Sequence, residues 1–261
     1  MSRAVILIVL AVVLTACASH GQVALRKPCD DYVGTAASYE QIGLQRLSRG
    51  DYRCAVAALQ NANDRGAGPT THLALGYLYQ YGLGTDIRED QAKELYEKAM
   101  AEGSKRAEAC LAVLYMQGFT TPHDLPAAIQ LLRDASGAGD AHATADLALA
   151  YEMGWGVPQD QAESAWLMNS AGPTVKLDFQ EYIAAIRERV AETPTPTMSR
   201  HGTVEVDFNL RGGSPLRIQV VKSSGYKDLD DAAVQRVDLT QFLPPDFGYL
   251  AYPHYVVDIA Y

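Results

Sequence analysis

The chain has 261 residues, a formal net charge of −9 and a hydrophobic fraction of 48%. This length accommodates one large domain or two smaller ones, and the apolar content is sufficient for a hydrophobic core. The negative charge argues against nucleic acid as a ligand, because proteins bind phosphates through Lys and Arg.

The first seventeen residues have the pattern of an export signal. Arg3 precedes the apolar run Val5–Leu14, which is too short to span a bilayer, since spanning takes roughly 20 residues. The run ends in Leu14-Thr15-Ala16-Cys17, which resembles a bacterial lipobox. The resemblance implies an acylated Cys17 as the membrane contact, and Ala18 implies the outer membrane. The alternative is ordinary secretion with an unmodified Cys17.

The other cysteines are Cys29, Cys54 and Cys110. An exported protein meets an oxidising compartment, in which a disulfide is permitted. Cys54 and Cys110 lie in helical patterns and are expected to be small buried residues, whereas a Cys29–Cys54 bridge is left open. No pair has CxxC spacing, which argues against a zinc or redox site.

A repeated segment runs from Ser38 to Gly172. Tyrosines and alanines recur in it every 36 residues, together with the glycines Gly82, Gly118 and Gly154. Apolar residues have helical spacing within each unit, and Gly ends a helix readily because it tolerates the left-handed conformation. The period therefore predicts a two-helix repeat. Aspartates precede the second helices and are expected to cap them: Asp90, Asp124 and Asp160.

Two repeat families share these patterns. The unit with small residues at Gly43, Ala55 and Ala62 resembles a tetratricopeptide repeat, and the three later units resemble Sel-like repeats. Such repeats stack into a solenoid that binds proteins on its concave surface. Aromatic residues that would serve as anchors there are Tyr77, Tyr81, Tyr96 and Trp155. The alternative is that these rings pack between the helices.

The repeats end in a capping helix and a linker. Lys176–Glu192 has apolar residues at helical spacing and is predicted to cap the last repeat. Thr193–Thr197 follows, and its alternate prolines forbid a helix.

The last sixty residues change to strand periodicity. Val204–Phe208 and Leu216–Val220 alternate apolar and polar residues and predict a hairpin. Asp228 is expected to cap a short helix, Leu243-Pro244-Pro245 is a predicted turn, and Tyr255–Tyr261 is a predicted last strand.

This order of elements resembles the C-terminal domain of the TonB family. The residues that carry the resemblance are Gly202–Val206, Ser223-Ser224-Gly225, Leu229–Ala233 and Phe242–Pro245. Members of that family bind partners by adding a strand to an edge of the sheet. The candidate edge is Tyr255–Tyr261, with Tyr255, Val257 and Ile259 as partner-binding residues. The alternative is that this strand is internal or covered by the linker.

The sequence has none of the residue patterns expected of an enzyme. The histidines lack the HExxH spacing of a zinc protease, and there is no G-x-S-x-G motif. His201 and His254 are the histidines that could approach the Ser223-Ser224 pair, but solvated surface histidines are the commoner outcome. We therefore expect no catalytic residues, no metal, no cofactor and no small-molecule substrate.

These observations predict an α+β multidomain protein, with an all-α helical-repeat solenoid followed by a small β-β-α-β TonB-like domain. The predicted function is a non-enzymatic interaction scaffold or adaptor, anchored in the outer membrane and facing the periplasm, with an envelope protein as partner. The alternatives are a TonB-like accessory that contacts outer-membrane receptors in nutrient uptake and, less favoured, an enzyme that acts on cell wall or lipid. The predicted segments are 1–16 (signal peptide), 17–35 (anchor and tether), 36–192 (repeats and capping helix), 193–201 (linker) and 202–261 (TonB-like domain).

Overall fold

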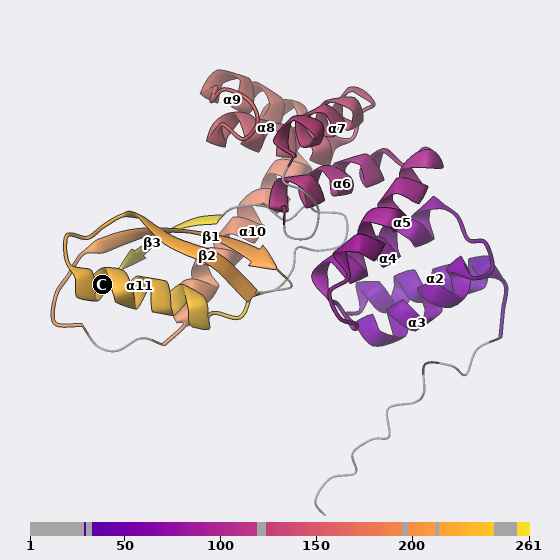
Figure 1. Ribbon diagram of the computed structural model, residues 1–261, viewed down its shortest axis with the longest axis horizontal. Helices are drawn as coiled ribbons and strands as arrows, with labels where there is room; N and C mark the ends of the chain where they lie inside the picture. The colour runs from indigo at the N-terminus through magenta and orange to yellow at the C-terminus, as the bar shows by residue number, and fades with distance from the viewer. Residues whose placement is uncertain (1–28, 30–32, 119–123, 195–197, 212–213, 243–254) are drawn as a thin grey trace, which may run out of the picture. The chain divides into compact units, whose positions relative to one another are not determined.

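The structure is a computed structural model that describes residues 29, 33–118, 124–194, 198–211, 214–242 and 255–261. The predicted signal peptide and the acylation site Cys17 lie outside the described residues, as do His254 and the predicted turn at 243–245. From Gly34 onward the chain forms a series of helices followed by a small sheet (Figure 1). In the described part of the chain, no helix has both the length and the hydropathy needed to cross a membrane.

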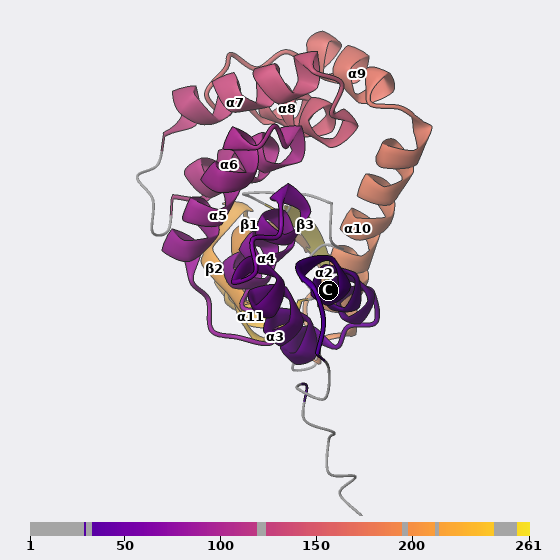
Figure 2. The same cartoon turned by 90° about the vertical axis from the view of Figure 1, so that its right-hand side faces the viewer.

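The helical region confirms the predicted solenoid of two-helix repeats. Consecutive helices pack as pairs, and each pair packs on the next (Figure 2). The helices are α2 (Ala36–Ser48), α3 (Tyr52–Asn63), α4 (Pro69–Tyr81), α5 (Glu89–Ala101), α6 (Lys105–Gln117), α7 (Leu125–Gly137), α8 (Ala141–Met153), α9 (Gln161–Ser170) and α10 (Pro173–Glu192).

The glycines of the repeat end the first helix of each unit, as predicted. Gly82, Gly118 and Gly154 have φ values of 65°, 59° and 75°, in the left-handed region that favours glycine. In each case the amide of the glycine donates to the carbonyl four residues earlier. The same 36-residue interval that appears in the sequence therefore sets where each first helix stops.

The predicted aspartate caps are confirmed at two of three positions. The carboxylates of Asp124 and Asp160 accept hydrogen bonds from first-turn amides of α7 and α9. The prediction for Asp90 is wrong, because α5 begins at Glu89 and Arg88 occupies the cap position without a side-chain hydrogen bond. Arg88 is also the residue 36 positions before Asp124, so the interval itself indicates the true boundary.

Small residues allow the helices to approach closely. In the tetratricopeptide-like pair α2–α3, a Cβ placed on Gly43 would lie 2.5 Å from Cγ of Leu59, and Ala55 and Ala62 are fully buried. Ala99 and Ala135, at the repeated position in second helices, are fully buried as well. These positions cannot accept larger side chains without a shift of the neighbouring helix.

Helix α10 does more than cap the last repeat. It contacts α8 and α9, but its Ile186 and Val190 are buried in one hydrophobic cluster with strand residues such as Val206. The ring of Tyr182 lies 6.2 Å from the ring of Tyr255. The side chains of residues 177–179, which include Phe179, lie outside the described part. Helix α10 is thus shared between the repeats and the C-terminal domain.

The C-terminal domain has the predicted β-β-α-β order. Strand β1 (Thr203–Arg211) pairs antiparallel with β2 (Ser214–Lys222) and with β3 (Tyr255–Ala260), giving the order β2-β1-β3. Helix α11 (Lys227–Leu239) packs on β1 and β2. Its N-cap is Tyr226, so the prediction that Asp228 caps this helix is wrong; Asp228 lies in the first turn, where a negative charge favours the helix dipole.

Candidate functional site

The aromatic residues predicted as partner anchors on the repeats lie inside the helical core. Tyr77, Tyr81 and Tyr96 are 5%, 6% and 0% exposed, and Trp155 is partly buried against the same cluster. Their packing matches the alternative that the sequence left open, in which repeat tyrosines lie between helices. Partner binding by these four residues stays a prediction.

Tyr96 is an example of a repeat tyrosine that packs and hydrogen-bonds inside the helical core. Its hydroxyl donates to Oε1 of Gln80 over 2.8 Å, and Nε2 of Gln80 donates to Oε1 of Gln117 over 3.2 Å. The ring lies against Gly76, where an added Cβ would be 2.4 Å from Cε1 of the tyrosine. Burial raises the pKa of Tyr96 well above its usual value. The hydroxyl thus stays protonated and acts as a donor between α5 and α4.

The cysteines have distinct roles in the structure. Cys29 and Cys54 are each disulfide-bonded, and Cys110 is a free, buried thiol. Burial raises the pKa of Cys110 to about 12. A buried thiol with so high a pKa has little nucleophilic thiolate, so Cys110 behaves as the small core residue that its helical context predicts.

The Ser-Ser-Gly turn of the C-terminal domain is held by one carboxylate. Asp230 accepts from the hydroxyl of Ser223 and, over 3.0 Å and 2.9 Å, from the amide and the hydroxyl of Ser224. The Ser223 hydroxyl is the largest cause that lowers the pKa of Asp230. Nδ1 of His201 lies 3.1 Å from the carbonyl oxygen of Tyr261. The serines therefore fix the turn to α11, and among the described residues no His–Ser–acid arrangement forms here.

Strand β3 lies at an edge of the described sheet. Tyr255, Val257 and Ile259 are 1%, 2% and 3% exposed and face the hydrophobic cluster, whereas Asp258 and Ala260 are exposed. β1 is the one described strand that pairs with β3. The three predicted partner-binding side chains thus serve the core, and binding at this strand would use the backbone of its other edge.

The register shows which backbone groups point to that edge. The amide of Tyr261 donates to the carbonyl of Gly202, and the amide of Gly202 donates back. In an antiparallel pair such mutually bonded partners alternate with non-bonded ones. Val257 and Ile259 therefore bond to β1, and the N–H and C=O groups of Val256, Asp258 and Ala260 point away from it.

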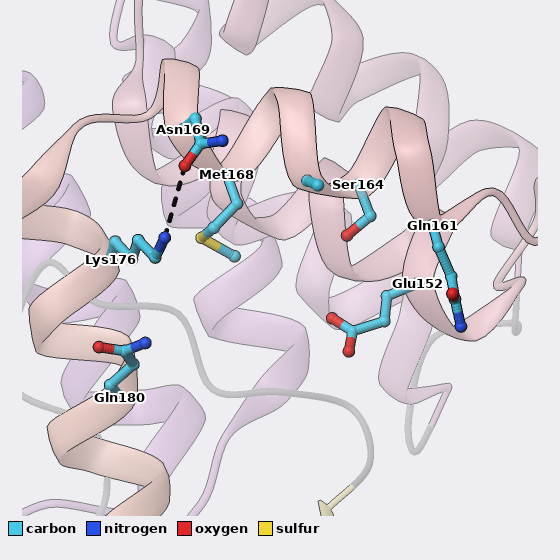
Figure 3. Close-up of a pocket in the computed structure, with 8 residues that line it drawn as sticks. Glu152, Gln161, Ser164, Met168, Asn169, Lys176 and Gln180 are labelled. Atoms are coloured by element: carbon cyan, nitrogen blue, oxygen red, sulfur yellow. Dashed lines mark hydrogen bonds between the residues drawn. The ribbon is translucent and has the colours of Figure 1, made fainter.

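A cavity with several polar lining residues, called the polar cavity below, lies in the last repeat, where no sequence motif indicates a site. It has a volume of ≈ 330 Å³ and is lined by residues of α8, α9 and α10: Glu152, Gln161, Ser164, Ala165, Met168, Asn169, Lys176 and Gln180. Lys176 and Asn169 lie at one end, and Glu152 and Gln161 lie at the other (Figure 3). Within the described part of the chain, no group of three or more His, Cys, Asp or Glu residues could hold a metal ion.

Comparison with known families agrees with this architecture. Residues 197–259 match the family of the Gram-negative bacterial TonB protein C-terminal domain. Residues 71–104, 106–140 and 141–172 match the Sel1 repeat. The chain therefore combines three Sel1 repeats, of a kind that serves protein–protein interaction, with a TonB-like C-terminal domain. No curated protein matches the chain.

Two solved structures are similar to the repeat region. A Sel1 repeat protein from Oxalobacter formigenes is 25% identical over 60% of this chain and 66% of its own, with a TM-score of 0.47. The protein c5321, a protective antigen of uropathogenic Escherichia coli with an SLR fold, is 22% identical over 59% of this chain and 34% of its own, with a TM-score of 0.45. This chain thus spans just under two thirds of the first protein and a third of the second.

Proposed function

We propose that this protein is a non-enzymatic interaction scaffold in the Gram-negative cell envelope, anchored in the outer membrane through an acylated Cys17 and facing the periplasm. The lipobox-like sequence and the TonB-type domain support this location. A lipid anchor confines the binding surfaces to a membrane and raises their effective concentration toward membrane-bound partners.

The observation that carries the proposal is the outer edge of β3. Its outward N–H and C=O groups have no strand partner in the described sheet, and such an edge pairs with an extended segment of another protein. The buried alternate side chains hold β3 rigidly on the core, so the edge is preformed. A periplasmic envelope protein with an extended segment is the partner that this geometry suits.

The edge can be tested without disturbing the fold. Asp258→Pro removes an outward N–H, and Pro is tolerated at an edge that makes no ladder bond. Asp258→Ala is the matched control, because it removes the carboxylate and keeps the N–H. With a photocrosslinking residue at Ala260 in cells, we expect a partner to be captured by the parent chain and the control but lost with Asp258→Pro. Equal capture by all three contradicts the edge as the binding element.

The anchor has a separate test. Cys17→Ser removes the acylated side chain, and we expect the protein to move from the membrane fraction to the soluble periplasm. Membrane association that persists in this variant contradicts lipid anchoring at Cys17.

A second candidate function is an accessory contact with outer-membrane receptors in nutrient uptake. The match of residues 197–259 to the TonB C-terminal family favours it. The same crosslinking experiment separates the two functions, because a receptor's periplasmic segment captured at Ala260 supports the accessory role, and a periplasmic or lipid-anchored partner supports the scaffold.

A further inference from the structure

The polar cavity occupies the place where a further repeat would pack. In the two preceding repeats, the residues at this position are fully buried: Ala92 and Tyr96, then Ala128 and Leu132. The counterparts 36 residues later are Ser164 and Met168. Ser164 thus carries a hydroxyl where Ala92 and Ala128 carry a methyl group. Ser164 is 6% exposed, and it lines the cavity.

Helix α10 lines this cavity with polar residues. It follows Gly172, whose φ of 96° turns the chain, and it contributes Lys176 and Gln180 to the cavity wall. Glu152 replaces Met116, which is 4% exposed in the preceding repeat. A helix packing on this surface would meet these polar groups as well as Met168, so the lining suits a ligand that has polar groups of its own.

Two opposite charges face the cavity without ion-pair partners. Among the described residues, neither Glu152 nor Lys176 forms an ion pair, and the one hydrogen bond of the lysine, to Oδ1 of Asn169, is long at 3.4 Å. Lys176, Asn169 and Gln180 gather at one end (Figure 3). Their ammonium and carboxamide N–H groups are donors that suit an anionic oxygen, and Glu152 at the other end suits a donor.

The remaining lining residues suit a peptide. The carboxamides of Gln161, Asn169 and Gln180 each offer a donor and an acceptor, which is the complement of a backbone amide. None of the described residues that line the cavity is aromatic. Its ≈ 330 Å³ is near the small end of ligand sites, which span about 300–1,000 Å³, and holds a few residues.

We propose that this cavity binds a short extended peptide, with its C-terminal carboxylate at Lys176, Asn169 and Gln180 and its N-terminal side toward Glu152. This proposal adds a ligand class to the proposed scaffold function and rests on that function. The same chemistry is present in a free peptide and in the C-terminal end of a partner protein.

The experiment uses trialanine as probe, titrated into the full-length protein in detergent and followed by the side-chain amide NMR signals of Asn169 and Gln180. We expect saturable shifts, with about tenfold or greater weakening when the peptide is C-amidated, because a charge-assisted hydrogen bond is lost. Lys176→Gln should remove this preference for the free carboxylate. Lys98→Gln, which changes an exposed lysine outside the cavity, is the charge-matched control and should keep it.

N-acetyl-trialanine separates the two sources of the carboxylate. Affinity retained on acetylation identifies the end of a protein chain, and affinity lost on acetylation but restored in Glu152→Gln identifies a free peptide. Absence of saturable binding, or equal binding of amidated and free trialanine, overturns the inference. This titration does not involve β3, so a negative result leaves the Asp258 crosslinking result unaffected. A negative crosslinking result likewise leaves the peptide titration unaffected.

Discussion

At the scale of single residues, the least expected feature of the solenoid is a buried carboxylate on α8. Oδ2 of Asp146 is buried without a hydrogen-bond partner among the described residues, although the side chain of Arg106 is close enough to affect its titration. Arg106 is itself 3.0 Å from Asp140. The positions that correspond to Asp146 in the two earlier units are Ala74 and Cys110, so an ionisable carboxyl group stands where the earlier units have a small buried side chain.

Asp146→Ala is expected to stabilise the protein at neutral pH. Burial raises the pKa of Asp146 well above its ordinary 3.8; Arg106 opposes the rise and Asp140 adds to it. When folding raises the pKa of a carboxyl group, the free energy of unfolding falls as the pH rises from the pKa of the unfolded state to that of the folded state. We expect a gain on the order of 1 kcal/mol at pH 7, which disappears below pH 3.8. Urea unfolding across this range measures it.

Glu94→Ala is the matched control for Asp146→Ala. It removes an exposed carboxylate from the same repeat region and should leave the free energy of unfolding nearly unchanged. A loss of stability in Asp146→Ala at pH 7 would show that the carboxylate has a stabilising partner.

Cys110 is expected to be inert in the folded protein. With the pKa of the thiol raised to about 12 by burial, alkylation at pH 8 should proceed only as fast as the chain unfolds. In a Cys17→Ser background, mass spectrometry should find no adduct on the native protein and one on the denatured, unreduced protein. An added exposed thiol, Ser48→Cys, reports the unhindered rate, and native Cys110 labelling at that rate would contradict the burial.

At the scale of the elements, the contact between the first and second helix is made by different side chains in different repeats. Position 76 is Gly and faces Tyr96, whereas 36 residues later the two positions are Ala112 and Leu132, both well buried. The larger ring is thus accommodated by the smaller helix residue. The hydroxyl of the ring is satisfied by Gln80, whose counterpart is Met116.

This relation predicts that Gly76→Ala is tolerated better when the residues around it are also changed to those of the next repeat. Gly76→Ala alone places a Cβ 2.4 Å from the ring and should cost about 1–3 kcal/mol of stability. Combined with Tyr96→Leu and Gln80→Met, it reproduces the trio of the next repeat and should recover most of the loss. Chemical denaturation of the single and triple variants measures this coupling. Simple addition of the separate effects would mean that the positions are independent.

The sequence predicts most of these elements because its 36-residue period and its glycines are local signals. The cap predicted at Asp90 is wrong because aspartate is a typical cap residue, whereas the 36-residue period indicates Arg88.

The candidate site is harder to predict from the sequence. Tyr96 has the residue type of a binding anchor, but its burial depends on the packing of α5 against α4, where Gly76 leaves room for the ring. The polar cavity combines side chains from α8, α9 and α10, and its sequence signals are the changes from Met116 to Glu152 and from Ala128 to Ser164 between equivalent positions.

At the scale of the whole molecule, α10 is one of the links between the two parts of the protein, beside the ion pair of Arg211 with Glu89. Ile186 and Val190 are each 3% exposed and pack with the C-terminal strands. At the end of the helix, the hydroxyl of Thr193 lies 2.8 Å from that of Thr240. The C-terminal domain therefore includes a helix that precedes the Pro-rich linker, and a boundary placed at the linker would divide its core.

Ile186→Ala tests this assignment of α10. Removing a buried isoleucine side chain typically costs about 2–5 kcal/mol, and here the loss should fall on the C-terminal domain. We expect faster hydrogen exchange at the amides of β1, β3 and α11, with little change in α2–α5, because a solenoid is stabilised mainly by contacts between neighbouring repeats. Arg187→Ala, at an exposed position of the same helix, is the control. Exchange that rises in the repeats while the sheet stays protected would assign α10 to the solenoid, and a chain ending at the linker would then keep its core.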